Sequence, residues 1–190
     1  METPRMARPR TIDRDRVLDC VEHLVQREGA AALTLDAVAR EAGITKGGLQ
    51  YCFGSKDDLI TALIDRWIVV FDAQVSQNMP PGSDATDRAR AYVVVASQID
   101  EATQARMAGM LVTLMQSPKH LHRLRAWYAR WFKVCNPASA VARRARTALF
   151  AAEGAFFLRS TGFIEMDQAE WETVFADFEQ LVTPLRASTD

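Results

Sequence analysis

The side chains best suited to contacts with a partner molecule lie in one short polar segment, residues 45–51. A glutamine there can form two hydrogen bonds to the edge of adenine, and a lysine and a tyrosine can reach phosphate oxygens. Glycines in the same segment let a backbone approach its ligand closely. This pattern favours recognition of DNA bases and phosphates, and the residues expected to face outward are Thr45, Lys46, Gly47, Gly48, Gln50 and Tyr51.

Two short helices are expected to position that segment. Thr34 can cap the first helix, and Gly43 interrupts it because the following turn needs a positive φ angle, which a Cβ atom resists. Thr45 can then cap a second helix over residues 46–53. A short helix, a glycine turn and another short helix are the parts of a helix-turn-helix. On the glycine turn alone, an ordinary helical hairpin with a solvated polar face explains the pattern equally well.

The rest of the chain follows the apolar period of amphipathic helices. Ser55 and Asp58 have the spacing of a capping box, and a long helix follows them. After a Pro- and Gly-rich break at residues 78–83, apolar stripes predict helices over 84–101, 103–116, 118–135, 138–161 and 168–187. The predicted fold class is therefore all-α, with about nine helices.

Residues 34–53, TLDAVAREAGITKGGLQYCF, and the following SKDDL at 55–59 resemble the TetR family of one-component transcriptional regulators. The resemblance is close over about the first 70 residues and only architectural beyond them. It implies a helix-turn-helix DNA-binding domain over residues 1–56 and a helical domain over 57–190 for effector binding and dimerisation. The implied function is a ligand-responsive regulator, most simply a repressor that a small molecule releases from a palindromic operator.

The resemblance also implies which residues contact DNA. Gln50 stands where the family often has an aromatic residue and Cys52 where it often has histidine, so Gln50 is a candidate for reading a base. Leu35 has no polar side-chain atom, so a contact there would use its backbone N–H. The implied DNA-binding residues are Thr34, Leu35, Thr45, Lys46, Gly47, Gln50, Tyr51 and Lys56.

Charge and cysteine usage set wider limits. The net charge of the 190 residues is −1, so bulk electrostatics gives no indication of a nucleic-acid partner. Three scattered cysteines fit a reducing compartment, and no apolar run approaches the length that spans a membrane, so a cytoplasmic location is predicted. Three N-terminal arginines form either a minor-groove arm or a loose tail: Arg5, Arg8 and Arg10.

No catalytic or metal-binding pattern is present in the sequence. The histidines have no cysteine or acid at ligand spacing and are interpreted as surface or capping residues, so no metal, cofactor or enzymatic activity is predicted. Two alternatives to the repressor remain at this point. One is an all-helical enzyme or ligand-binding protein without DNA function, and the other is a dimeric regulator that needs no effector.

Aromatic and methionine side chains predict an effector pocket in the C-terminal half. Methionine-rich linings adapt to varied ligands, although each such residue is individually more typical of plain core. The predicted pocket residues are Trp67, Phe71, Tyr92, Ile99, Met107, Met110, Leu111, Leu114 and Arg125.

The last two predicted helices are candidates for a homodimer interface. The small residues of one allow close approach, and the apolar stripe of the other is broad for a helix that ends a chain. The predicted interface residues are Ala145, Leu149, Ala152, Phe156, Val174, Phe178 and Leu181.

Two charged residues in apolar surroundings are each expected to have an ion-pair partner. Arg125 falls on the apolar side of its predicted helix, and Glu153 is the only acid within the apolar run 148–158. Because a buried unpaired charge is costly, each should be paired. Two outcomes are open: Arg125 pairs with Glu153 or similar neighbours, or Arg125 faces the pocket and anchors an acidic effector.

Overall fold

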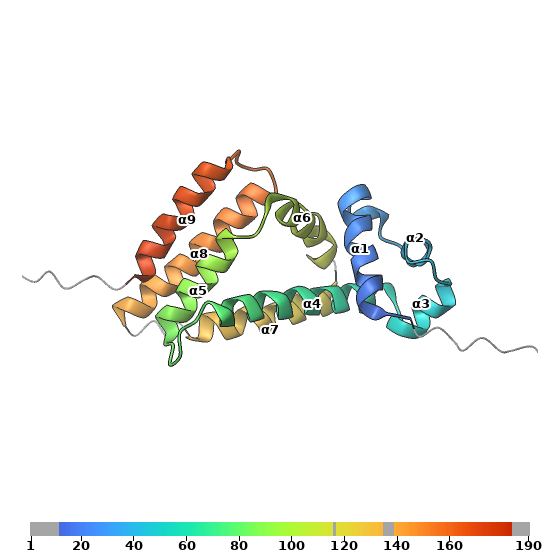
Figure 1. The fold of residues 1–190 in the computed structure, drawn as a ribbon, viewed down its shortest axis with the longest axis horizontal. Coiled ribbons are helices and arrows are strands. Elements are labelled where there is room, and N and C mark those ends of the chain that lie inside the picture. The colour runs from blue at the N-terminus through green and yellow to red at the C-terminus, as the bar shows by residue number, and fades with distance from the viewer. Residues whose placement is uncertain (1–11, 116, 135–138, 184–190) are drawn as a thin grey trace, which may run out of the picture.

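The computed structural model describes residues 12–115, 117–134 and 139–183. At one end of the molecule lies a three-helix unit, which is at the right of Figure 1. It consists of α1 (Arg14–Glu28), a 3₁₀ turn (Ala30–Ala32), α2 (Leu35–Glu41) and α3 (Lys46–Phe53). These helices pack around side chains with no exposed surface, which are Val21, Leu33, Val38 and Leu49.

The long helix α4 (Lys56–Gln77) runs from this unit through the rest of the molecule, and α7 (Pro118–Val134) lies beside it (Figure 1). Cations of α7 pair with carboxylates of α4 along this contact. The pairs are Lys119 with Asp58, Arg123 with Asp65, and Arg130 with Asp72. The face of α7 that carries these cations is therefore solvated and also tied to α4.

Three further helices form a second layer: α5 (Ala85–Ser97), α8 (Ala140–Ser160) and α9 (Gln168–Val182). The buried Trp171 of α9 donates its indole N–H to the carbonyl of Ser97 at 2.8 Å, which fastens α9 to the end of α5. The helix α6 (Glu101–Met115) crosses between this layer and the three-helix unit, contacting both α8 and α1 (Figure 1).

The all-α prediction is confirmed, because the described residues contain nine α-helices, one 3₁₀ turn and no strand. The helix expected over 84–101 ends earlier, at Ser97. Asp100 then accepts hydrogen bonds from the amide and hydroxyl of Thr103, so a new helix starts there. In the described part of the chain, no helix is long and apolar enough to cross a membrane.

Candidate functional site

The turn between α2 and α3 has the geometry that its glycine predicts. Gly43 has a φ angle of 65°, and the amide of Ile44 donates to the carbonyl of Ala39 at 3.0 Å. Ala39 and Ala42 are buried, and such small side chains let the two helices approach closely. The segment therefore has the short helix, glycine turn and second short helix of a helix-turn-helix.

The helix α3 turns its apolar side to the core and its polar side to solvent. Leu49 is fully buried, whereas Tyr51 is 93% exposed. Gly48 lies on the packed side, and not on the outward side expected from the sequence, because a Cβ atom there would be 2.9 Å from Ile12 Cδ1. The other predicted contact residues of α3 and its cap are exposed, namely Thr45, Lys46, Gly47 and Gln50.

The remaining predicted DNA contacts lie at helix starts. Thr34 Oγ1 accepts the amide hydrogen of Ala37 at 3.1 Å and so caps α2, as Thr45 caps α3 through the amide of Gly48 at 3.0 Å. The side chain of Leu35 packs against the core, which leaves its backbone as the only polar group. Lys56 is partly buried as the first residue of α4.

Lys46 of α3 forms a weak ion pair whose carboxylate a DNA phosphate can replace. Lys46 Nζ lies 2.8 Å from Asp36 Oδ2, and both side chains are more than half exposed. Such a surface pair contributes about 0–1 kcal/mol, so a phosphate can replace the carboxylate at little cost. Arg14 was not predicted as a site residue and has a structural role. It donates to the carbonyl of Cys52, and its guanidinium lies 4.1 Å from the centroid of the Phe53 ring.

The predicted arginine arm, Arg5, Arg8 and Arg10, lies outside the described residues, as does one of the three cysteines, Cys135. Among the residues that the structure does describe, no group of three or more His, Cys, Asp or Glu side chains could hold a metal ion.

The start of α4 is fastened to the start of α7. Ser55 and Asp58 form the predicted capping box, and Lys119 pairs with Asp58 from the other side. His120 is only 1% exposed, and its Nε2 lies 3.1 Å from the carbonyl oxygen of Asp57. The interpretation of this histidine as a surface or capping residue is wrong, because it is buried where α7 meets α4. The C-terminal helices thus contact the chain directly after the helix-turn-helix.

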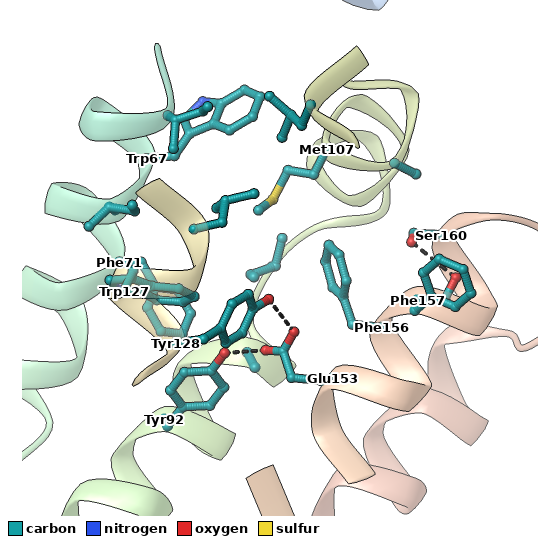
Figure 2. A pocket seen from close by; sticks show the side chains of 17 residues that line it. Trp67, Phe71, Tyr92, Met107, Trp127, Tyr128, Glu153, Phe156, Phe157 and Ser160 are labelled. Carbon is teal, nitrogen blue, oxygen red and sulfur yellow. Dashed lines mark hydrogen bonds between the residues drawn. The ribbon is translucent and has the colours of Figure 1, made fainter. Parts of the chain in front are cut away.

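A cavity of about 210 Å³, partly open to solvent, lies between α4, α5, α6, α7 and α8 (Figure 2). Its lining is predominantly apolar and rich in aromatic rings. Trp127 and Tyr128 of α7 belong to this lining but were not predicted, because Arg125 was the only residue of that helix expected to face the pocket. The predicted pocket residues that lie in the wall are Trp67, Phe71, Tyr92, Ile99, Met107 and Leu114.

Glu153 is the polar centre of the cavity wall. Tyr128 donates its phenol hydrogen to one carboxylate oxygen at 2.6 Å, and Tyr92 donates to the other (Figure 2). Burial raises the pKa of Glu153, and the two phenol hydrogen bonds oppose that rise. Burial and the charge of Glu153 raise the pKa of both tyrosines, so the phenols remain protonated donors at neutral pH.

The other predicted pocket residues do not lie in the wall. Met110 is fully buried in the core outside the cavity lining, and the side chain of Leu111 is outside the described part of the chain. Arg125 is exposed, so both of its expected roles, ion-pair partner of Glu153 and cavity anchor, are wrong. The physical reason is that α7 turns a different side to the core, centred on His120, Leu124, Trp127 and Trp131.

The interface residues predicted on α8 are also corrected. Ala145, Leu149 and Ala152 are fully buried within a single chain, where α8 packs against α5 and α9. Phe156 lines the cavity instead (Figure 2). The small residues do allow close helix approach, but the approaching helices belong to the same subunit.

The predicted interface residues on α9 remain accessible in part. Val174 and Phe178 are partly buried, and Leu181 is exposed. The helix α8 and the loop after it also carry large apolar side chains exposed to solvent, which are Phe150, Leu158, Phe163 and Phe157, the last of which lines the cavity as well. Gly154 lies among them, and a Cβ atom added to it would meet nothing within 4 Å.

Comparison with known proteins gives two family matches. The model described as "Bacterial regulatory proteins, tetR family" matches residues 18–63. The model described as "Tetracyclin repressor-like, C-terminal domain" matches residues 86–183.

Curated relatives match one half of the chain. The HTH-type transcriptional regulator BetI of Paraburkholderia phytofirmans is 31% identical over 96 residues, which cover 48% of this chain and 46% of that protein. BetI of Burkholderia thailandensis is 32% identical over 92 residues, covering 48% and 47%. The chain thus spans about half the length of these curated relatives.

Solved structures match nearly the whole chain. A putative TetR-family regulator from Rhodococcus sp. has a TM-score of 0.70 at 17% identity, covering 89% of this chain and 96% of the other. A TetR transcription regulator from Haloarcula marismortui has a TM-score of 0.71 at 17% identity, covering 89% and 95%. GusR of Salmonella enterica has a TM-score of 0.64 at 15% identity, covering 94% and 99%. At these identities the similarity shows the fold.

Proposed function

The chain belongs to the TetR family of transcriptional regulators, and we propose that within it this protein is a repressor that a small molecule releases from its DNA operator. The family and the curated relatives are regulators and not enzymes, so the enzyme alternative is set aside. The proposed repressor acts in the cytoplasm as a homodimer on a palindromic operator. Its division into a DNA-binding part, residues 1–56, and an effector part, residues 57–190, is part of the proposal.

One observation carries this proposal: a single helix, α4, belongs to both sites. Its first turn holds the capping box directly after the helix-turn-helix. Arg66 of the same helix pairs with Asp19 and Glu22 of α1 at 2.6 Å each, and the next residue, Trp67, lines the cavity. A ligand that displaces α4 therefore moves the DNA-binding unit with it.

The direction of the response follows from differential affinity. A ligand shifts a conformational equilibrium only as far as it binds one state better than the other. We expect the effector to favour a position of α4 in which the two recognition helices no longer match adjacent major grooves, which are about 34 Å apart. The proposed DNA contacts are Thr34, Leu35, Thr45, Lys46, Gly47, Gln50, Tyr51 and Lys56.

Dimerisation is proposed through the exposed apolar surface of α8 and α9. Monomeric proteins rarely leave several large apolar side chains exposed on neighbouring elements without a partner. Phe157, Leu158 and Leu181 are each more than a third exposed, and Phe163 is 71% exposed. Gly154 supports close approach of a second copy, because the space outside it is empty.

The test measures operator binding and its reversal. Fluorescence anisotropy with duplexes from the region upstream of the protein's own gene should find one tightly bound site, and a metabolite panel should contain a compound that releases it. Ala108→Phe places a large ring in the cavity wall and should abolish release while leaving DNA binding intact. Ala102→Phe, on the exposed side of α6, is the matched control.

Two results would contradict the proposal. Equal affinity for the upstream duplex and for random DNA would show that the upstream region contains no specific operator. Release that is unchanged in Ala108→Phe would show that the effector binds outside the cavity.

A further inference from the structure

The cavity contains a carboxylate without a cationic partner. The ion pairs formed within the described residues all use other acids. Both oxygens of Glu153 lie within hydrogen-bonding distance of a phenol oxygen, and these two bonds favour the ionised carboxylate while burial raises its pKa. A negative charge in an apolar wall is costly without a counter-charge, and a positively charged ligand would supply it.

The rings around Glu153 suit the same charge. Tyr92 lies edge-on to Phe71 with ring centroids 4.8 Å apart, and Trp127 lies edge-on to Tyr128 at the same separation. All four rings line the cavity. Aromatic faces carry partial negative charge and attract cations, and they bind quaternary ammonium groups in aromatic cages.

Two indoles of the cavity wall point their polar edges away from the cavity. Trp67 donates its N–H to Glu22 at 2.6 Å, and Trp127 donates its N–H to Asp72 at 2.9 Å. Neither N–H is free to bind an acceptor on a ligand, and each ring gains electron density from the carboxylate that it contacts. The wall therefore offers few hydrogen-bond donors to an anion and electron-rich rings to a cation.

The size of the cavity limits the ligand. An apolar protein cavity of about 150 Å³ holds benzene, so a cavity of about 210 Å³ holds one ring with a few more heavy atoms. Both oxygens of Glu153 are already engaged by phenols, so a ligand with no N–H groups needs no rearrangement of this cluster.

We propose that the effector is a small lipophilic organic cation, of the quaternary ammonium type, whose charge lies beside Glu153 within the aromatic wall. This inference rests on the proposed function, in which the cavity is the effector site. It names the charge class of the ligand and the residue that selects it.

The test uses a pair of probes of equal shape. Phenyltrimethylammonium and tert-butylbenzene differ only in a charged nitrogen for a carbon, and benzoate adds a negative ring compound. Calorimetry with the full-length protein should show the cation binding on the order of tenfold or more tightly than its neutral isostere, and no binding of benzoate.

Glu153→Gln keeps the shape of the side chain and removes its charge. In this variant the preference for the cation should disappear while tert-butylbenzene still binds. Glu172→Gln removes the same charge from an exposed position on α9 and should leave the preference unchanged.

The outcomes separate this inference from the proposed function. Equal or tighter binding of tert-butylbenzene, binding of none of the probes, or a cation preference that survives Glu153→Gln would each overturn the cation proposal. Operator binding is measured on the same samples without any probe. If operator binding is present in those cases, the repressor proposal is retained and only the proposed charge of the effector is rejected.

Discussion

The recognition surface and the cavity are built in opposite ways. The recognition surface, which is the proposed set of DNA contacts, comes from one continuous segment, 34–56, whose helices are capped locally and whose polar side chains are mostly exposed. The cavity is built from five helices between residues 64 and 160, and its polar group is surrounded by rings. A surface of the first kind can exchange water and weak ion pairs for phosphates without rearrangement. A ligand in a site of the second kind contacts side chains from several helices at once.

The difference shows where the two sites must be coupled. Lys46 and Asp36 interact in a high dielectric and lose little when separated, so a phosphate can take the place of the Asp36 carboxylate without a change in packing. Glu153 interacts with Tyr92 and Tyr128 in a partly buried setting, where each contact is stronger than in bulk water. A ligand beside that cluster also meets side chains of α4, since Phe71 lies edge-on to Tyr92 in the same wall, and α4 is the helix common to both sites.

The largest expected effect is on operator affinity, which should fall when the proposed dimer is disrupted while the cavity stays intact. Gly154→Glu should yield a monomer, since two carboxylates would face each other across the two-fold axis. The fold of each subunit should survive because the added Cβ has open space and glutamate favours helix more than glycine. Operator affinity should fall by about a hundredfold or more once one half-site must hold the protein alone, while ligand binding in the cavity persists.

Sedimentation and anisotropy measure both effects of Gly154→Glu. Gly109→Glu is the control, because Gly109 lies on an exposed helical position of α6 with equally open space. A Gly154→Glu protein that still sediments as a dimer would place the interface elsewhere.

The sequence predicts those features that a few neighbouring residues decide. The caps at Thr34 and Thr45 and the capping box of Ser55 with Asp58 each depend on one helical turn, so composition and spacing suffice. The special character of Glu153 was also visible, as a lone acid in an apolar run. Its partners Tyr92 and Tyr128 were not, because they are 61 and 25 residues away and meet it only when three helices pack.

The wrong predictions have the same origin. A stripe of small residues shows that a helix packs closely, but not against which helix. The seam predicted between subunits, at Ala145, Leu149 and Ala152, is for that reason a seam within one subunit. The orientation of α7 likewise depends on its contacts with α4, which no local pattern contains.

A smaller effect is expected from Gln50→Ala, which should change DNA binding and leave the cavity unaffected. Gln50 is exposed on α3, and Gln50→Ala should cost about 1–3 kcal/mol on the cognate operator and relax specificity at one base pair, since a bidentate contact to adenine is lost. Binding to operators with each single substitution measures this. Uniform loss across all operators would show that Gln50 positions the protein without reading a base, and cavity ligands should bind the variant normally in either case.

Salt dependence sharpens the contrast between the two sites. Lys46→Ala and Lys56→Ala should each weaken binding to all duplexes alike and reduce the slope of log affinity against log salt by about one unit. Affinity for a cavity ligand should change far less with salt, because the lining is predominantly apolar and carries a single carboxylate, Glu153. An unchanged DNA slope would remove that lysine from the phosphate contacts.

The smallest expected effect concerns Arg125, which was predicted from the sequence to be buried and is exposed in the structure. Arg125 is exposed on α7, on the side away from His120, Trp127 and the cavity. Removal of an exposed side chain that has no special backbone role changes stability by no more than about 0.5 kcal/mol. Arg125→Met should therefore leave the urea midpoint, operator affinity and effector release as they are in the parent protein. A fall of a few kcal/mol in the free energy of unfolding would mean that Arg125 has a buried partner, and selective loss of release would return it to the effector site. Because Glu153 already has two phenol partners, neither result is expected.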